Sequence, residues 1–123
     1  MLSNDIPIFQ QLAAQIKDDI VAGTYADETA VPSTNEYAVF YRINPATAGK
    51  AVNLLVEQGI LYKKRGVGMF VSPGAAELLL AQRRDRFTTE FLTPMLREAQ
   101  TLGIGPSDLA AMIDREAVSD ERH

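Results

Sequence analysis

Basic side chains and short hydrogen-bonding side chains cluster in the middle of this chain of 123 residues. Lys50 and the run 63–65 supply ammonium and guanidinium groups, and Asn44 and Thr47 lie just before the first of them. Positive groups of this kind bind phosphate oxygens, and they also donate hydrogen bonds to the edges of bases. Residues 44–65 could therefore bind a phosphate-bearing polymer.

The overall charge argues in the opposite direction, since 12 Lys and Arg residues stand against 16 Asp and Glu residues and the net charge is −4. The distribution along the chain matters more than this sum. Five of the six basic residues in 1–72 fall between Arg42 and Arg65, whereas five of the seven acids come before residue 29. A run of charges is usually only a solvated face, so the elements that position these residues decide its meaning.

Two helices are expected before the basic cluster. Apolar residues recur at helical spacing from Pro7 to Val21, and Gly23 follows where a helix commonly ends. Residues 24–32 form a loop. Ser33 to Glu36 then has the form of a capping box, which predicts a short helix to about Tyr41.

A third helix should follow a turn at 42–43, in which Ile43 is buried. Asn44 caps this helix, Pro45 is suited to its first position, and Gly59 ends it after Gln58. The helix has a core face and an opposite, exposed face. The core face holds Ala48, Ala51, Val52 and Leu55, and the exposed face holds Ala46, Lys50, Asn53 and Glu57.

Two strands, Ile60–Lys64 and Met69–Ser72, are expected around a tight turn at 65–68. Pro73-Gly74 breaks the pattern and marks a domain boundary. The order helix, helix, turn, helix, hairpin is that of a winged helix-turn-helix, a DNA-binding device. The sequence thus predicts a mainly α fold with a small β-hairpin, in which residues 1–72 form the DNA-binding domain.

Residues 73–123 are expected to form a short α-helical dimerisation tail. A long helix should run from Ala75 to Leu102 with a kink at Pro94, and a last helix should run from Pro106 to about Ala117, followed by a frayed end. We expect the arginines at 83–86 to form ion pairs. The apolar stripe of the long helix is read as a dimer seam in preference to a core or a ligand pocket; it contains Phe87, Phe91, Leu92, Met95, Leu96 and Leu102.

Residues 7–72 resemble the GntR family of bacterial transcription regulators. The family's Pro-Ile-Tyr start, Leu-Pro-Ser-x-Arg-x-Leu-Ala segment and Gly-x-Gly-x-Phe-Val wing correspond here to 7–9, 31–38 and 66–71. The short tail resembles the YtrA-like subfamily, which implies a homodimer and an operon with transporter genes. Three features depart from the family pattern: Asn35 replaces the Arg, Asp27-Glu28 replace a Pro-Gly, and Ala46 and Gly49 replace polar or basic residues.

We therefore expect a homodimeric repressor that binds an inverted repeat in double-stranded DNA, with few base contacts and more readout of DNA shape. The alternative is a winged helix that binds only other proteins, which the net charge favours and the clustered basic residues do not. Some candidates have a second reading, since Ser33 and Asn44 are also caps. The candidate DNA-binding residues are Ser33, Asn35, Asn44, Ala46, Thr47, Lys50, Lys63, Lys64, Arg65 and Gly66.

Enzyme, metal and membrane functions find no support in the sequence. It has no cysteine, its single histidine is His123, and no metal-ligand spacing, phosphate-binding glycine loop or activated nucleophile is present. No signal peptide is recognisable, and no apolar run approaches the ~20 residues that span a bilayer. We expect a cytoplasmic protein without a cofactor. A tail of this size is too small to enclose a metabolite, so an effector would need a cleft at the dimer interface.

Overall fold

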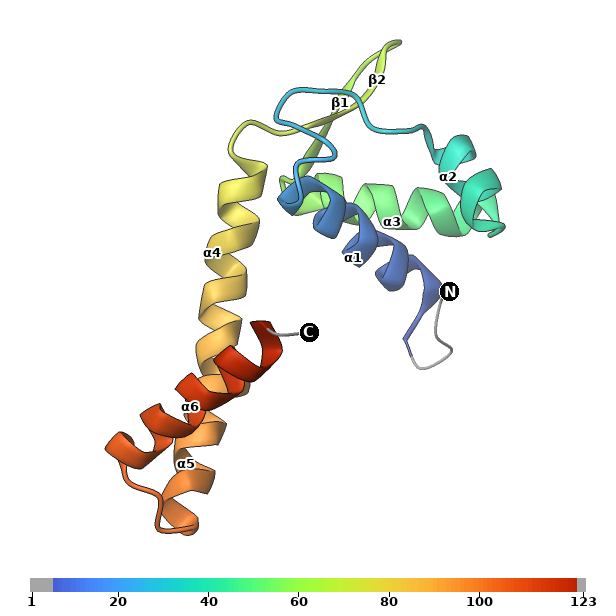
Figure 1. The fold of residues 1–123 in the computed structure, drawn as a ribbon. Helices are drawn as coiled ribbons and strands as arrows, with labels where there is room; N and C mark the ends of the chain where they lie inside the picture. Colours follow the sequence, from blue (N-terminus) through green and yellow to red (C-terminus); the bar gives the residue numbers. More distant parts are fainter. Residues whose placement is uncertain (1–5, 122–123) are drawn as a thin grey trace. The chain divides into compact units, whose positions relative to one another are not determined.

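The computed structural model describes residues 6–121, which form two compact units that divide between Ala81 and Gln82. In the first unit, two helices pack against a third, and a β-hairpin follows (Figure 1). This is the winged helix-turn-helix that the sequence predicts. Its elements are α1 (Ile8–Val21), α2 (Thr34–Tyr41), α3 (Pro45–Glu57), β1 (Leu61–Lys64), β2 (Gly68–Val71) and the start of α4 (Ala75–Phe87).

The helix ends follow from local chemistry. The Ser33 hydroxyl oxygen accepts a hydrogen bond from the Glu36 amide at 3.1 Å, and the Glu36 carboxylate accepts one from the Ser33 amide at 3.0 Å. This reciprocal pair satisfies two amides that the first turn of α2 leaves without helical partners. Arg42 ends α2 with φ of 56°, in the left-handed region. Asn44 then caps α3, and Pro45 occupies its first turn.

The hairpin is antiparallel, with Leu61 opposite Val71 and Lys64 opposite Gly68. A third segment adds to it, because Ala30 forms a bridge with Phe70 and the Val31 amide donates to the Met69 carbonyl at 3.0 Å. The sequence analysis predicted only a loop for 24–32, because a single bridge pair is too short to produce an alternating pattern of apolar residues. The segment ties the start of α2 to the hairpin.

One apolar core holds the first unit together. The predicted core face of α3 is fully buried, whereas Ile43, which we expected to be buried, is only half-buried against the core. Small side chains on α3 allow the neighbouring helices to approach closely. The largest fully buried side chains are Leu12, Ile16, Ile20, Leu55, Ile60, Leu61, Val52 and Val71.

The second unit contains the end of α4, a π-helical turn η1 (Thr88–Leu92), α5 (Thr93–Thr101) and α6 (Pro106–Glu121). The single regular helix expected up to Leu102 is therefore interrupted just before Pro94. Proline has no N–H and its ring collides with the carbonyl four residues earlier, which a wider turn relieves. The Thr89 hydroxyl donates to the carbonyls of Asp85 and Arg86 within this stretch.

The last helix is longer than predicted, since α6 continues through Ser119 and Asp120 to Glu121 instead of ending near Ala117. Ser119, Asp120 and Glu121, which were expected to fray, are thus helical, and residues 122–123, which include His123, lie outside the described residues. Within 6–121, no helix is long and apolar enough to cross a membrane.

Candidate nucleic-acid interface

The exposed face of α3 carries the first group of candidate residues. Asn44 Oδ1 accepts a hydrogen bond from the Ala46 amide at 2.8 Å, so this oxygen is engaged in capping the helix. Ala46 and Lys50 are exposed, and Thr47 is half-buried. A helix N-terminus of this kind presents backbone amides and a partial positive charge, both of which suit a phosphate.

A groove runs along this face and brings α1 into the site. It has a volume of about 560 Å³ and includes Phe9 of α1 beside Gly49, Lys50 and Asn53 of α3. The Lys50 ammonium nitrogen lies 4.2 Å from the centre of the Phe9 ring, which is a cation–π contact. The contact holds the long lysine side chain against the groove wall. Ala46, Leu54 and Glu57 complete the lining.

The start of α2 lies next to this face of α3. A Cβ atom built on Gly49 would lie 3.6 Å from Cγ2 of Thr34, which is ordinary contact distance. Ser33 and Asn35, on either side of Thr34, are both exposed. The hydrogen bond from the Ser33 amide lowers the pKa of Glu36, so this carboxylate stays ionised beside the helix start. A side-chain hydrogen bond from Ser33 is the second cause of the lowered pKa, so the Ser33 side chain is engaged with Glu36 as well as with the amide that it caps.

The wing carries the second group of basic residues. Residues 63–66 are all exposed, and Gly66 adopts φ of 76° at the tip of the hairpin. Lys64 is anchored, because its ammonium nitrogen lies 4.3 Å from the centre of the Phe70 ring. Phe70 in turn stacks on Tyr62, with ring centres 5.9 Å apart. These contacts hold the two strands of the hairpin together. The hairpin thus carries the exposed side chains of Lys63 and Arg65.

The structure distributes the predicted site residues over three places. Ala46 and Lys50 meet in the groove on α3, Ser33 and Asn35 lie at the start of α2, and 63–66 form the wing. The sequence analysis missed Phe9 and Asn53 as groove residues. Asn53 was already assigned to the exposed face with Lys50, and that shared face was the available signal. Phe9 was assigned only to the apolar face of its own helix.

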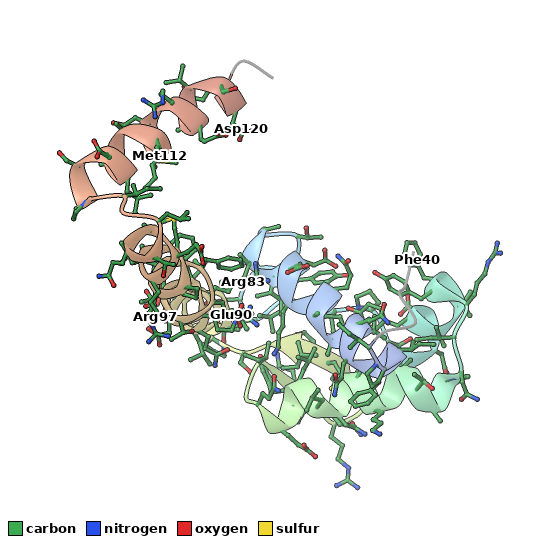
Figure 2. The ribbon with its side chains drawn as sticks, turned by 90° about the horizontal axis from the view of Figure 1, so that it is seen from below. Phe40, Arg83, Glu90, Arg97, Met112 and Asp120 are labelled. Carbon is green, nitrogen blue, oxygen red and sulfur yellow. The ribbon has the colours of Figure 1, made fainter. Side chains whose placement is uncertain are left out.

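The candidate dimer residues of the tail are exposed. Phe87 and Phe91 have 59% and 62% of their surface open to solvent, and their ring centres are 6.0 Å apart. A groove of about 570 Å³ between α5 and α6 is lined by apolar side chains, and the acids Glu116 and Asp120 lie farther along α6. Figure 2 labels Met112 and Asp120, which both belong to this lining. The apolar part consists of Met95, Leu109, Met112, Ile113 and Ala117.

Comparison with known sequences gives consistent matches. The family model for bacterial regulatory proteins of the gntR family matches residues 8–71. The repressor NagR of Bacillus subtilis is 37% identical over 75 residues, or 61% of this chain and 31% of NagR. The repressor YtrA of the same organism is 29% identical over 98 residues, or 80% of this chain and 75% of YtrA. The chain thus spans about a third of the length of NagR.

Two solved structures extend the comparison. A protein described as a transcriptional regulator of the GntR family from Bacteroides thetaiotaomicron has a TM-score of 0.76 and 34% identity, and the match covers 92% of this chain and 98% of that one. The DNA-binding domain of AraR, solved in complex with the operator ORX1, has a TM-score of 0.54 and 32% identity over 58% of this chain and 87% of that one.

Proposed function

The chain belongs to the GntR family of bacterial regulatory proteins, and we propose that it acts in the cytoplasm as a transcriptional repressor whose winged helix binds operator DNA. The observation that carries the proposal is the exposure of the basic side chains at Lys50 on α3 and at 63–65 on the wing. The match to the AraR domain, which was solved on its operator, supports the same use of the fold.

The N-terminal half of α3 enters the major groove in this proposal, as recognition helices of this class do. Thr47 and Lys50 reach base edges or phosphates, while Ser33 and Asn35 at the start of α2 hold the backbone. The small residues Ala46 and Gly49 leave few base contacts, so the shape of the DNA contributes to the choice of site. Arg65, at the tip of the wing, enters a minor groove or lies along the phosphates.

The tail makes the chain a homodimer. A stripe that includes Phe87, Phe91 and Leu102 is exposed in the single chain, and side chains of this size are stabilised by burial. A two-fold dimer binds a DNA site with matching symmetry, so the operator is an inverted repeat with half-sites roughly 10 bp apart. The resemblance to YtrA favours an operator that controls the protein's own operon together with transporter genes.

The test is binding of the full chain to the DNA upstream of its own coding sequence, measured by mobility shift and footprinting. We expect a two-fold symmetric footprint and a steep loss of affinity with salt, since each neutralised phosphate contributes about one unit to the slope. Lys50→Ala and Arg65→Ala should each weaken binding by about 1–3 kcal/mol if they contact bases. Arg84→Ala in the tail is the matched control and should bind as the wild type does.

A winged helix that binds only proteins would behave differently in the same experiment. It would show no salt-dependent binding to either the upstream DNA or a random duplex, and Lys50→Ala would change nothing. That result would overturn the proposal. Equal loss of binding in Arg65→Ala and Arg84→Ala would instead place the DNA-facing surface elsewhere.

A further inference from the structure

A second pocket lies between α1, α2 and the segment that precedes α2, and it shares no lining residue with the groove that contains Lys50. Its volume is about 480 Å³, within the range of roughly 300–1,000 Å³ that is usual for small-molecule sites. Nothing in the DNA-binding proposal uses it. Four aromatic rings and two carboxylates form most of its lining: Tyr25, Tyr37, Phe40, Tyr41, Asp19 and Glu36.

The aromatic rings are packed against one another. Phe40 meets Tyr41 edge to face, with ring centres 4.9 Å apart and planes at 80°, and Tyr37 stacks on Tyr41 at 6.5 Å. Tyr37 is buried at the back of this cluster, whereas Phe40, labelled in Figure 2, has 72% of its surface open to solvent. Covering the exposed Phe40 ring with the alkyl groups of a ligand would bury apolar surface, which is favourable. The cluster offers the negatively polarised faces of several rings to a ligand.

The charge at this pocket is of one sign. Asp19 and Glu36 are acidic, and no basic residue is among the described residues that line the pocket. The Asp19 carboxylate accepts a hydrogen bond from Gln15 Nε2 at 3.2 Å, which fixes its position. Burial, and then the negative charge of Asp19, raise the pKa of Tyr41. The negative charge of Asp19 therefore lies close enough to Tyr41 to act on its hydroxyl group.

Tyr37 lies in the core, and its pKa is affected by some of the same neighbours. Its hydroxyl oxygen is buried, and Tyr25 is the residue that interacts with it by hydrogen bonding. Burial is the largest cause that raises the pKa of Tyr37, and Tyr25 and Asp19 add to it. The pocket thus combines ring faces, a fixed carboxylate and a negative field, each of which attracts a positive charge.

We propose that the pocket between α1 and α2 binds a small organic ammonium ion. Ring faces attract such a cation and also cover its alkyl groups, while Asp19 neutralises its charge. A metal ion fits poorly, since it needs several oxygen or nitrogen ligands and no cluster of three His, Cys, Asp or Glu residues occurs among the described residues. An anion would be repelled by both carboxylates. The site is independent of the DNA-binding proposal.

The test compares two ligands of the same shape. The full chain is titrated with choline and with 3,3-dimethylbutan-1-ol, in which a carbon atom replaces the charged nitrogen, and the aromatic proton resonances are followed by NMR. Choline should bind and shift the signals of Tyr25, Phe40 and Tyr41. The neutral analogue should bind roughly tenfold more weakly, because it lacks the attraction to the rings and to Asp19.

Variants separate the contribution of each part. Asp19→Asn keeps the shape but removes the charge, and should weaken choline binding roughly tenfold. Phe40→Leu should weaken it several-fold, whereas Phe40→Tyr retains a ring face and should restore it. Glu77→Gln, at an exposed acid of α4, is the matched control. Circular dichroism of each variant establishes that it is folded.

Three results would overturn the inference. These are equal affinity for choline and its neutral analogue, unchanged choline binding in both Asp19→Asn and Phe40→Leu, and no choline-induced shift at millimolar concentration. None of them bears on DNA binding, so the DNA proposal and the pocket proposal fail or succeed separately.

Discussion

Lys50 on α3 rests on the ring of Phe9 on α1, with its ammonium nitrogen 4.2 Å from the ring centre. A residue of the first helix thus positions a charged side chain of the third, although more than half of the winged helix lies between them in the sequence. The contact limits the conformations that Lys50 samples before it meets a phosphate or a base. Phe9 is accordingly a positioning residue for the proposed DNA contact.

Replacement of Phe9 by leucine should weaken operator binding by about 0.5–1 kcal/mol, because the cation–π contact is lost while the apolar volume is largely kept. Phe9→Tyr preserves the ring face and should restore the affinity. Mobility shifts at one fixed salt concentration measure both. Since Phe9 also packs against the core, urea denaturation of each variant is the control. Unchanged affinity in Phe9→Leu would show that Lys50 is positioned by other contacts.

Glu28 occupies a position where the family has glycine and adopts φ of 62° there. A residue with a side chain pays roughly 1–2 kcal/mol to adopt this conformation, whereas glycine adopts it without strain. Glycine also makes the unfolded chain more flexible, which offsets part of that gain. Glu28→Gly should therefore stabilise the protein by up to about 1 kcal/mol in urea denaturation. Ala26→Gly, nearby but at ordinary φ, should destabilise it. A loss of stability in Glu28→Gly would mean that the carboxylate makes a compensating interaction.

Gly49 lies inside α3, where glycine is less favourable than alanine by about 1 kcal/mol. A new Cβ would only touch Thr34 at 3.6 Å, so Gly49→Ala should raise the free energy of unfolding by up to about that amount. Gly59→Ala is the contrasting control and should destabilise, because Gly59 adopts φ of 76°. If Gly49 allows α3 to approach DNA closely, the stabilised variant will bind operator less tightly.

The capping box of α2 should make stability depend on acidity. The pKa of Glu36 is lowered in the folded chain, first by the hydrogen bond from the Ser33 amide, so the folded state favours the charged form. The stabilisation by the charged Glu36 is fully present above the pKa of glutamate in the unfolded chain. It is lost as the pH falls through the lowered pKa of Glu36 in the folded chain. Glu36→Gln should be less stable than the wild type at neutral pH, and the two should converge in acid. Thermal denaturation over a pH series measures the difference.

Phe91→Asp should convert the protein from a dimer to a monomer at micromolar concentration, since it places a charge in the exposed apolar stripe of the tail. Sedimentation equilibrium distinguishes the two states. Arg97→Asp, which introduces the same residue at an exposed polar position of α5 (Figure 2), should remain dimeric. A wild-type chain that sediments as a monomer would remove the basis for a two-fold operator.

The features that the sequence predicted well are those determined within a few residues. The cap at Ser33, the cap at Asn44 and the hairpin around Gly66 depend on local hydrogen bonds and allowed dihedral angles, and all three occur in the structure. The buried face of α3 followed from helical spacing alone. Local patterns of this kind were enough to predict the fold and to place the basic residues on exposed surfaces.

The features that escaped sequence analysis depend on contacts between distant segments. Two examples are the bridge between Ala30 and Phe70 and the contact between Phe9 and Lys50. Each joins residues that are far apart in the sequence, and no local sequence pattern indicates the partner. The length of α6 was underestimated because its last residues are polar, and polar residues continue a helix without an apolar period to show it. The pocket beside Asp19 likewise arises only when α1 and α2 are packed together.

The π-helical turn at Thr88–Leu92 holds one residue more than a regular helical turn does. If one residue were removed from this stretch, the turn would close as regular α-helix, and Met95 and Leu102 would keep roughly their direction relative to Phe87. Removal of one residue from the regular helix between Met95 and Leu102 would instead rotate Leu102 by about 100° relative to Met95, because each residue of an α-helix turns the chain by that angle. The π-turn is thus a place where the tail can change in length while its apolar stripe stays on one face.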